Sequence, residues 1–247
     1  MSQQWEWVFG LHSIKTLLKR DSRRIHELLI QQGRQDQRIE SILEIAAEKF
    51  VKVRHVPRQE LDKTIDGVHQ GVAARVEPQR AQNENWFERY MDELQETPFL
   101  LVLDGVTDPH NLGACLRTAD AAGIHAVIAP KDKSAPLNST VVKVACGAAE
   151  AVPYVQVTNL ARTLKNLQER GVWLIGTAGE ADSTVYQASL TGPMALIMGA
   201  EGNGMRRLTR DLCDSLVSIP MAGEVSSLNV SVATGVCLFE AVRQRQS

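Results

Sequence analysis

The chain has 247 residues, of which 44% are hydrophobic and 23% are charged, and its formal net charge is −2. This length and composition are typical of a soluble protein with one large domain or two small ones, and the near-neutral charge indicates no nucleic-acid partner by itself. No apolar run reaches membrane-spanning length, and the first ten residues lack the basic and apolar regions of a signal peptide, so we expect a cytoplasmic protein without a membrane segment.

Charge is unevenly distributed along the chain. Residues 1–80 contain 14 Lys and Arg against 11 Asp and Glu, a net charge of +3, whereas residues 81–97 contain one Arg and five acids. A mildly basic N-terminal part permits a phosphate-bearing partner. The four cysteines, Cys115, Cys146, Cys213 and Cys237, are far apart and form no C-x-x-C motif, so we expect no metal or redox site and interpret each as a small buried hydrophobe.

The N-terminal third alternates short helical and strand patterns. Apolar spacing predicts helices over 11–19 and 39–50, and strands over 25–30, 51–56 and 71–76. These elements would form a compact α/β domain over residues 1–77. Residues 78–97 are polar and acidic, and we interpret them as a linker that ends in a short helix.

Residues 98–247 repeat the order strand, turn, helix. The expected strands are 99–103, 126–129, 152–157, 172–176, 195–198 and 216–219. The expected helices are 112–122, 139–149, 160–170, 206–213 and 230–245. Because the strands are almost continuously apolar and alternate with helices, the fold class is α/β, with a mostly parallel sheet covered on both faces.

Asn111 and Arg117 follow the first strand of this half. Asn111 precedes an apolar-periodic run that stops at Gly123, so it is either a helix cap, a functional side chain, or both. Arg117 has mostly small or apolar neighbours and no acid four residues before it, so it either forms a structural ion pair or binds a carboxylate or phosphate ligand.

Two further polar turns follow later strands. In GAEGNG, Glu201 is flanked by glycines, but Gly199, Gly202 and Gly204 do not match the spacing of the dinucleotide motif G-x-G-x-x-G. In SSLN, either serine could cap the last helix, yet Ser226, Ser227 and Asn229 together exceed what capping needs. Because strand ends of a parallel sheet converge, we expect the three turns to form one site.

These three stretches resemble the motifs of the SpoU (TrmH) branch of the SPOUT RNA methyltransferases. The matches are Asn111-Leu-Gly-x-x-x-Arg117, Gly199-Ala-Glu201-Gly202 and Ser227-Leu228-Asn229, in the order that the family shows. FGLHSI at 9–14 and HQGVAA at 69–74 are similar to the ribosomal-protein-like substrate domain of one subset. The whole chain is most similar to the bacterial 23S rRNA (guanosine-2′-O-)-methyltransferases, which implies a guanosine of 23S rRNA as the substrate.

The resemblance implies a fold, a cofactor and partners. It implies a deep C-terminal trefoil knot in a 98–247 methyltransferase domain, an RNA substrate-binding domain at 1–77, and a homodimer that acts on 23S rRNA without a metal. The implied cofactor is S-adenosyl-L-methionine. Its expected binding residues lie in the loops that would form the knot: Thr177, Ala178, Gly179, Leu196, Gly199, Gly202, Ile219, Met221, Ser227 and Leu228.

The resemblance also implies catalytic roles for Asn111, Arg117, Glu201, Ser227 and Asn229 in 2′-O-methylation of the ribose. Since arginine stays protonated in proteins, we expect Arg117 to bind the adjacent phosphate and stabilise the developing alkoxide. Glu201, a phosphate oxygen or water would then accept the proton. Two alternatives remain open: a tRNA ribose 2′-O-methyltransferase, and a non-catalytic RNA-binding or ribosome-assembly factor with the same fold.

Overall fold

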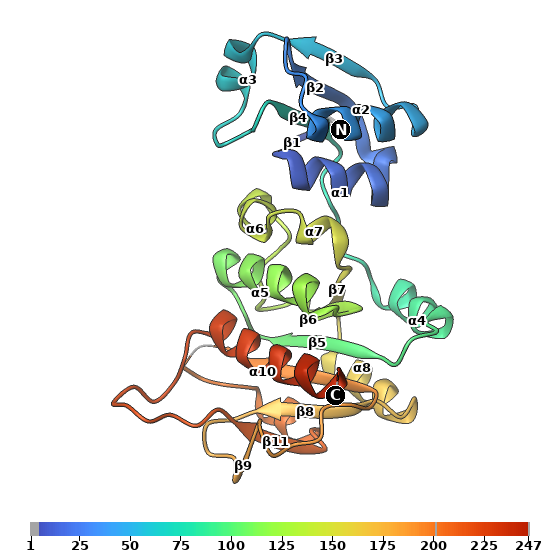
Figure 1. Ribbon diagram of the computed structural model, residues 1–247. Helices are drawn as coiled ribbons and strands as arrows, with labels where there is room; N and C mark the ends of the chain where they lie inside the picture. The colour runs from blue at the N-terminus through green and yellow to red at the C-terminus, as the bar shows by residue number, and fades with distance from the viewer. Residues whose placement is uncertain (1–4, 201, 247) are drawn as a thin grey trace. The chain divides into compact units, whose positions relative to one another are not determined.

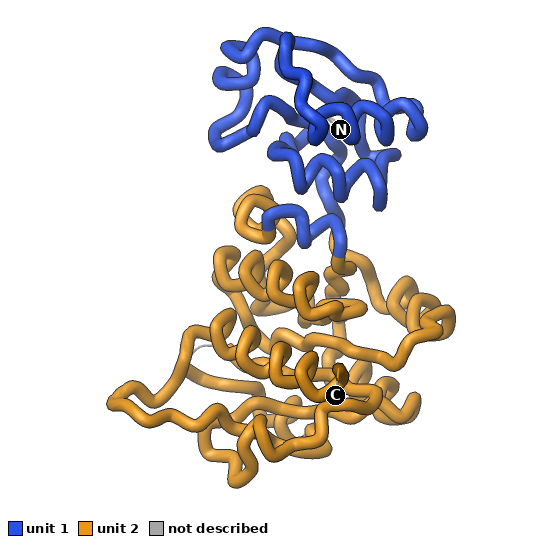
Figure 2. Tube along the Cα trace, in the orientation of Figure 1, with its two compact units in different colours: residues 1–80, 146–151 blue, residues 81–145, 152–247 orange. Residues whose placement is uncertain are grey.

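The computed structural model describes residues 5–200 and 202–246. The chain forms two compact units (Figure 2). The N-terminal unit consists of residues 1–80 together with 146–151, and the C-terminal unit consists of residues 81–145 and 152–247. Each unit has its own sheet.

The N-terminal unit has a four-stranded sheet in the order β1-β4-β2-β3. β4 is antiparallel to β1 and β2, whereas β2 and β3 are parallel. Its strands are β1 (Glu6–Phe9), β2 (Ile25–Gln31), β3 (Val53–Val56) and β4 (Val72–Val76); its helices are α1 (Leu11–Asp21), α2 (Gln37–Glu48), α3 (Arg58–Thr64) and the 3₁₀ turn Ser22–Arg24. Ile14, Leu17 and Leu18 of α1 are fully buried, as the apolar spacing predicts.

A short helix from the second half of the chain, α7 (Ala148–Ala151), belongs to the N-terminal unit. Glu150 of α7 accepts a 2.5 Å bond at Oε2 from Arg24 Nη1, and Gln79 Nε2 donates to the carbonyl of Ala149. Burial raises the pKa of Glu150, and the Arg24 charge opposes that shift. The ion pair therefore compensates part of the cost of burying the carboxylate.

The C-terminal unit has a seven-stranded sheet in the order β7-β6-β5-β10-β8-β11-β9, and every strand pair in it is parallel. This confirms the α/β class and the parallel sheet. The strands are β5 (Phe99–Asp104), β6 (Ala126–Pro130), β7 (Tyr154–Val157), β8 (Trp173–Thr177), β9 (Ser183–Thr184), β10 (Met194–Gly199) and β11 (Ser215–Ser218). The helices are α4 (Glu84–Glu93), α5 (Pro109–Ala122), α6 (Ser139–Ala145), α8 (Leu160–Glu169), α9 (Arg207–Asp211) and α10 (Val230–Arg245).

Helices cover both faces of this sheet. On one face, α4 and α8 pack against alternate residues of the central strands, such as Leu100, Val102 and Ile197. On the other face, α10 contacts both α5 and β10, and α5 and α10 lie side by side (Figure 1). Since successive side chains of a strand point to opposite faces, one apolar strand can supply both cores.

The expected helix over 139–149 is wrong in one respect, because it is two helices. Cys146 has a φ of 52° and Gly147 a φ of 95°, so the backbone leaves the right-handed helical region between α6 and α7. Gly147 suits this break because glycine adopts positive φ without a Cβ clash. Of the helices in the described ranges, none combines the length and apolarity that a membrane crossing requires.

Candidate functional site

A cavity of about 830 Å³ opens at the carboxyl ends of β8, β10 and β11. Its lining comes from the loops after these three strands and from the segment that enters α10. This is where an open parallel sheet binds its ligands, because the strand ends bring several loops together.

The cavity gathers most of the residues that the resemblance implies for cofactor binding. Those in its lining are Thr177, Ala178, Gly179, Gly199, Gly202, Ile219, Met221, Ser227 and Leu228. Leu196 is different: it lies within β10, is 1% exposed and does not line the cavity. Glu201 lies outside the described residues.

The loop after β10 turns back sharply at the cavity wall. Ala200 and Gly204 exchange two backbone hydrogen bonds of 3.0 and 2.9 Å. A Cβ on Gly199 would lie 2.2 Å from the carbonyl carbon of Gly204 and from the nitrogen of Met205. Only glycine fits at position 199, so this residue is required for the shape of the turn.

A buried carboxylate anchors the far end of the same loop. Asp104, at the end of β5, is 1% exposed and accepts bonds from Arg206 Nε at 2.6 Å and from the Arg206 backbone nitrogen at 2.9 Å. A charge-assisted pair with an added backbone bond holds a loop firmly. The turn is therefore tied to the sheet at both ends.

Asn229 and Asn111 connect the starts of two helices. Asn229 caps α10 by accepting at Oδ1 from the backbone nitrogen of Ser231, and its Nδ2 donates to Asn111 Oδ1 at 2.9 Å. Asn229 also lines the cavity. The cap of α10 is thus Asn229 rather than Ser226 or Ser227.

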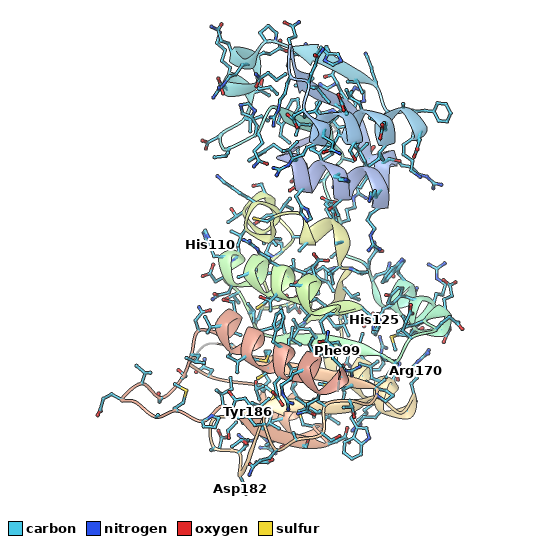
Figure 3. The ribbon with its side chains drawn as sticks, viewed as in Figure 1. Phe99, His110, His125, Arg170, Asp182 and Tyr186 are labelled. Atoms are coloured by element: carbon cyan, nitrogen blue, oxygen red, sulfur yellow. The ribbon has the colours of Figure 1, made fainter. Side chains whose placement is uncertain are left out.

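The capping interpretation of Asn111 is wrong. Asp108 caps α5 by accepting from the backbone nitrogen of His110 at 2.8 Å, and Pro109 occupies the first helical position. His110 itself is exposed at this end of the helix (Figure 3). Asn111 is 9% exposed, and its side chain carries the bond to Asn229 instead.

Arg117 lies on the exposed side of α5 and lines neither this cavity nor the one described next. The described residues of one chain therefore bring Asn111, Ser227 and Asn229 together, but they do not bring Arg117 to the cavity.

A second cavity, of about 620 Å³, adjoins the first and was not predicted from the sequence. Asn111 lines it, as do Asp108, Lys133 and Arg206. The two cavities share five lining residues, namely Ala200, Asn203, Gly204, Met205 and Val230. Lys133 has no motif around it, and only its position at a strand end could have suggested a role.

The first cavity suits S-adenosyl-L-methionine in size and chemistry. Its volume falls in the range of small-molecule sites, and its lining combines apolar side chains such as Met198 and Ile219 with backbone groups of glycine turns. Two charged side chains in the lining, Glu180 and Arg210, pair with each other, and this pair lowers the pKa of Glu180. Because these two charges are paired with each other, the other polar side chains that the described lining offers a ligand are uncharged, such as Ser227 and Asn229.

The cysteines differ in environment. Burial raises the pKa of the Cys213 and Cys237 thiols to about 12, and Cys115 is buried. Cys146 is exposed, so its interpretation as a buried hydrophobe is wrong, because it lies at the break between α6 and α7. Across residues 5–200 and 202–246, no group of three or more His, Cys, Asp or Glu is arranged to hold a metal ion.

The fold and site define an α/β protein with a cofactor-sized cavity beside a second polar cavity. Residues 98–239 match the SpoU rRNA Methylase family, and residues 7–82 match the family described as RNA 2'-O ribose methyltransferase substrate binding. The chain belongs to the SpoU rRNA methylase family.

Curated relatives and a solved structure are similar over nearly the whole chain. The chain is 60% identical over 242 residues to the 23S rRNA (guanosine-2'-O-)-methyltransferase RlmB of Pseudomonas aeruginosa, covering 98% of both chains. It is 60% identical over 241 residues to RlmB of Escherichia coli strain K12, covering 97% of this chain and 99% of the relative. The SpoU methyltransferase AviRb from Streptomyces viridochromogenes, in complex with the cofactor AdoMet, aligns with a TM-score of 0.78 at 26% identity, covering 98% of this chain and 91% of that one.

Proposed function

We propose that this chain transfers a methyl group from S-adenosyl-L-methionine to the ribose 2′-hydroxyl of a guanosine in 23S rRNA. The observation that carries this is the first cavity, whose lining contains residues of the 199–202 and 227–229 motifs. Asn229 in that lining also bonds to Asn111, which belongs to the remaining motif, 111–117. The rRNA substrate follows from relatives that are 60% identical over nearly the whole chain and are named for that reaction.

The bound cofactor supplies an electrophilic methyl group on a sulfonium. The protein must hold the ribose 2′-oxygen in line with the methyl carbon, and such alignment is worth up to about 7–11 kcal/mol of the barrier. As the new O–C bond forms, the C–S bond breaks, the sulfur keeps the electron pair and the hydroxyl proton leaves. The Asn229–Asn111 pair would orient the ribose and the cofactor carboxylate, with Ser227 beside them.

Arg117 needs a second copy of the chain to take part. Because it lines neither cavity of its own chain, we propose a homodimer in which each chain presents Arg117 to the site of the other. There the guanidinium would bind a phosphate beside the ribose and stabilise the developing alkoxide, while Glu201, a phosphate oxygen or water accepts the proton.

An apolar face on α10 supports this dimer. Val232 is 52% exposed and Phe239 is 48% exposed, and their spacing of seven residues places both on one side of the helix. Exposed apolar side chains in a row favour burial against a partner.

We further propose the deep C-terminal trefoil knot and an RNA substrate-binding role for residues 1–77; the match of residues 7–82 to a substrate-binding family supports the latter.

Methyl transfer with labelled S-adenosyl-L-methionine tests the proposal. Unmodified 23S rRNA and tRNA serve as parallel substrates, and the product nucleoside is identified. We expect 2′-O-methylguanosine in 23S rRNA alone. Label confined to tRNA would overturn the substrate, and cofactor binding without label in either RNA or in assembling ribosomal particles would favour a non-catalytic factor.

The Arg117 arrangement has its own test. Arg117→Ala and Asn229→Ala chains are each inactive in this scheme, but mixing them forms heterodimers in which one site has both residues. Recovery of activity on mixing supports a site shared between chains. No recovery, with heterodimers present by mass spectrometry, would contradict it.

A further inference from the structure

The second cavity has the position required of an acceptor site. Its wall of Ala200, Asn203, Gly204, Met205 and Val230 is also a wall of the first cavity. Methyl transfer needs the two reacting atoms about 3–3.5 Å apart, so donor and acceptor must occupy adjoining spaces. At about 620 Å³ the second cavity is large enough for a nucleotide.

The charged side chains that line this cavity differ in whether they already bond to other groups of the protein. Asp104 and Arg206 bond to each other at 2.6 Å, and the Asp108 carboxylate caps α5. Lys133 is exposed, and it forms no ion pair with a described residue. Its ammonium is therefore available to a ligand, whereas the other charges already have partners.

The backbone at Lys133 places it at the cavity. Lys133 has a φ of 58°, in the left-handed region that a lysine rarely adopts, within the loop that follows β6. The same loop bonds back to the loop after β5, since the nitrogen of Ala135 donates to the carbonyl of Val106 at 2.8 Å. Non-glycine residues held in this conformation concentrate at functional sites.

We propose that the second cavity receives the target guanosine nucleotide and that Lys133 binds one of the two backbone phosphates flanking its ribose. This rests on the proposed function and deepens it. The ammonium pairs with the phosphate as a compact point charge, which positions RNA without reading its sequence. Asn111 lines the same cavity and bonds to Asn229 of the cofactor cavity, so the nucleotide lies beside the groups that orient its ribose.

Lys133→Gln, with Lys131→Gln as the matched control, tests the proposal. Lys131 is an exposed lysine two residues earlier and lines neither cavity. For Lys133→Gln we expect KM for 23S rRNA to rise about five- to tenfold, with little change in kcat or in the Kd of S-adenosyl-L-methionine. The slope of log Kd for RNA against log salt should fall by about 0.7–0.9, the value for one phosphate contact. Lys133→Arg should restore the wild-type KM.

Equal KM and equal salt slopes for Lys133→Gln and Lys131→Gln would overturn the proposal. So would a rise in the Kd of S-adenosyl-L-methionine that accounts for the lost activity, because Lys133 would then act on the cofactor cavity. The RNA Kd is measured without cofactor. If the wild-type chain transferred no methyl group, the proposed function would fail while the RNA Kd still tested Lys133.

Discussion

Gly199→Ala should destroy the cofactor cavity while leaving the sheet folded. The added Cβ would lie 2.2 Å from two backbone atoms of the 204–205 segment, and ordinary contact begins at 3.4 Å, so the two segments must separate by about 1 Å. Overpacking of this kind costs about 1–3 kcal/mol. A displacement of about 1 Å in a reacting site lowers the rate roughly 100-fold.

The assay pairs calorimetric binding of S-adenosyl-L-methionine with methyl transfer and thermal unfolding. Gly223→Ala is the control, because a Cβ there meets nothing within 4 Å and position 223 has no positive φ. We expect Gly199→Ala to lower the unfolding temperature modestly and to lose about 100-fold in transfer, with Gly223→Ala unchanged. Wild-type affinity and turnover in Gly199→Ala would refute the argument that the close turn at 199–205 shapes the site.

Three further predictions concern other parts of the chain. Asn229→Ala removes both the cap of α10 and the bond to Asn111, so it should lower the free energy of unfolding by about 2 kcal/mol. Asn229→Asp keeps the cap but can no longer donate to Asn111 Oδ1, so it should lose activity with little loss of unfolding temperature. Arg243 and Gln244 lower the pKa of Glu240 to about 2 from 4.5, so its stabilisation is complete above about pH 4.5 and is lost as pH falls toward 2. Acid unfolding of Glu240→Gln should accordingly be less steep between those values; an identical profile would contradict this. Iodoacetamide at pH 8 should alkylate the exposed Cys146 and spare Cys237, because burial raises the pKa of the Cys237 thiol to about 12. Peptide mass spectrometry after a timed quench measures the two rates, and faster alkylation of Cys237 would contradict the prediction.

The fold could be predicted where local signals and burial agree. The last helix begins at Val230 and ends at Arg245 as expected, because Asn229 supplies a cap and the apolar pattern runs without interruption. α5 begins three residues before the predicted start at 112, because Asp108 caps the helix and Pro109 occupies its first position, whereas the apolar pattern alone points to Asn111 as the cap. Short elements such as β1, α3 and β9 were missed because their few residues show little periodicity.

The break between α6 and α7 was not predicted for a different reason. A single glycine within a helical pattern is often tolerated, so Gly147 gave only a weak signal, and the positive φ of Cys146 has no sequence signature. The consequence is tertiary: Glu150 turns to the N-terminal unit and pairs with Arg24, 126 residues earlier in the chain. Such distant pairs depend on topology, which local patterns do not contain.

Some residues of the candidate site could likewise be predicted from local sequence motifs, and others depend on the folded chain. Residues within motifs, such as Gly199 and Ser227, could be found because the motif specifies a turn whose backbone lines the cavity. Leu196 belongs to the strand that leads into that turn, and its side chain packs inside the sheet. Lys133 lies in no motif, and its role depends on a loop that meets the β5 loop only in the folded chain.

The shared wall between the two cavities explains why one short turn carries so many constraints. A donor and an acceptor that react must meet directly, about 3–3.5 Å apart with nothing between them. The turn after β10, whose residues Ala200, Asn203, Gly204 and Met205 line both cavities, borders the place where they would meet. The close approach at Gly199 keeps this turn tight, and the Asp104–Arg206 pair fixes it to β5. A bulkier turn would separate the reacting atoms, and a looser one would not hold them in line. Substitutions that thicken the turn and those that release it should therefore lower kcat alike, although only the former reduce the volume available to the cofactor.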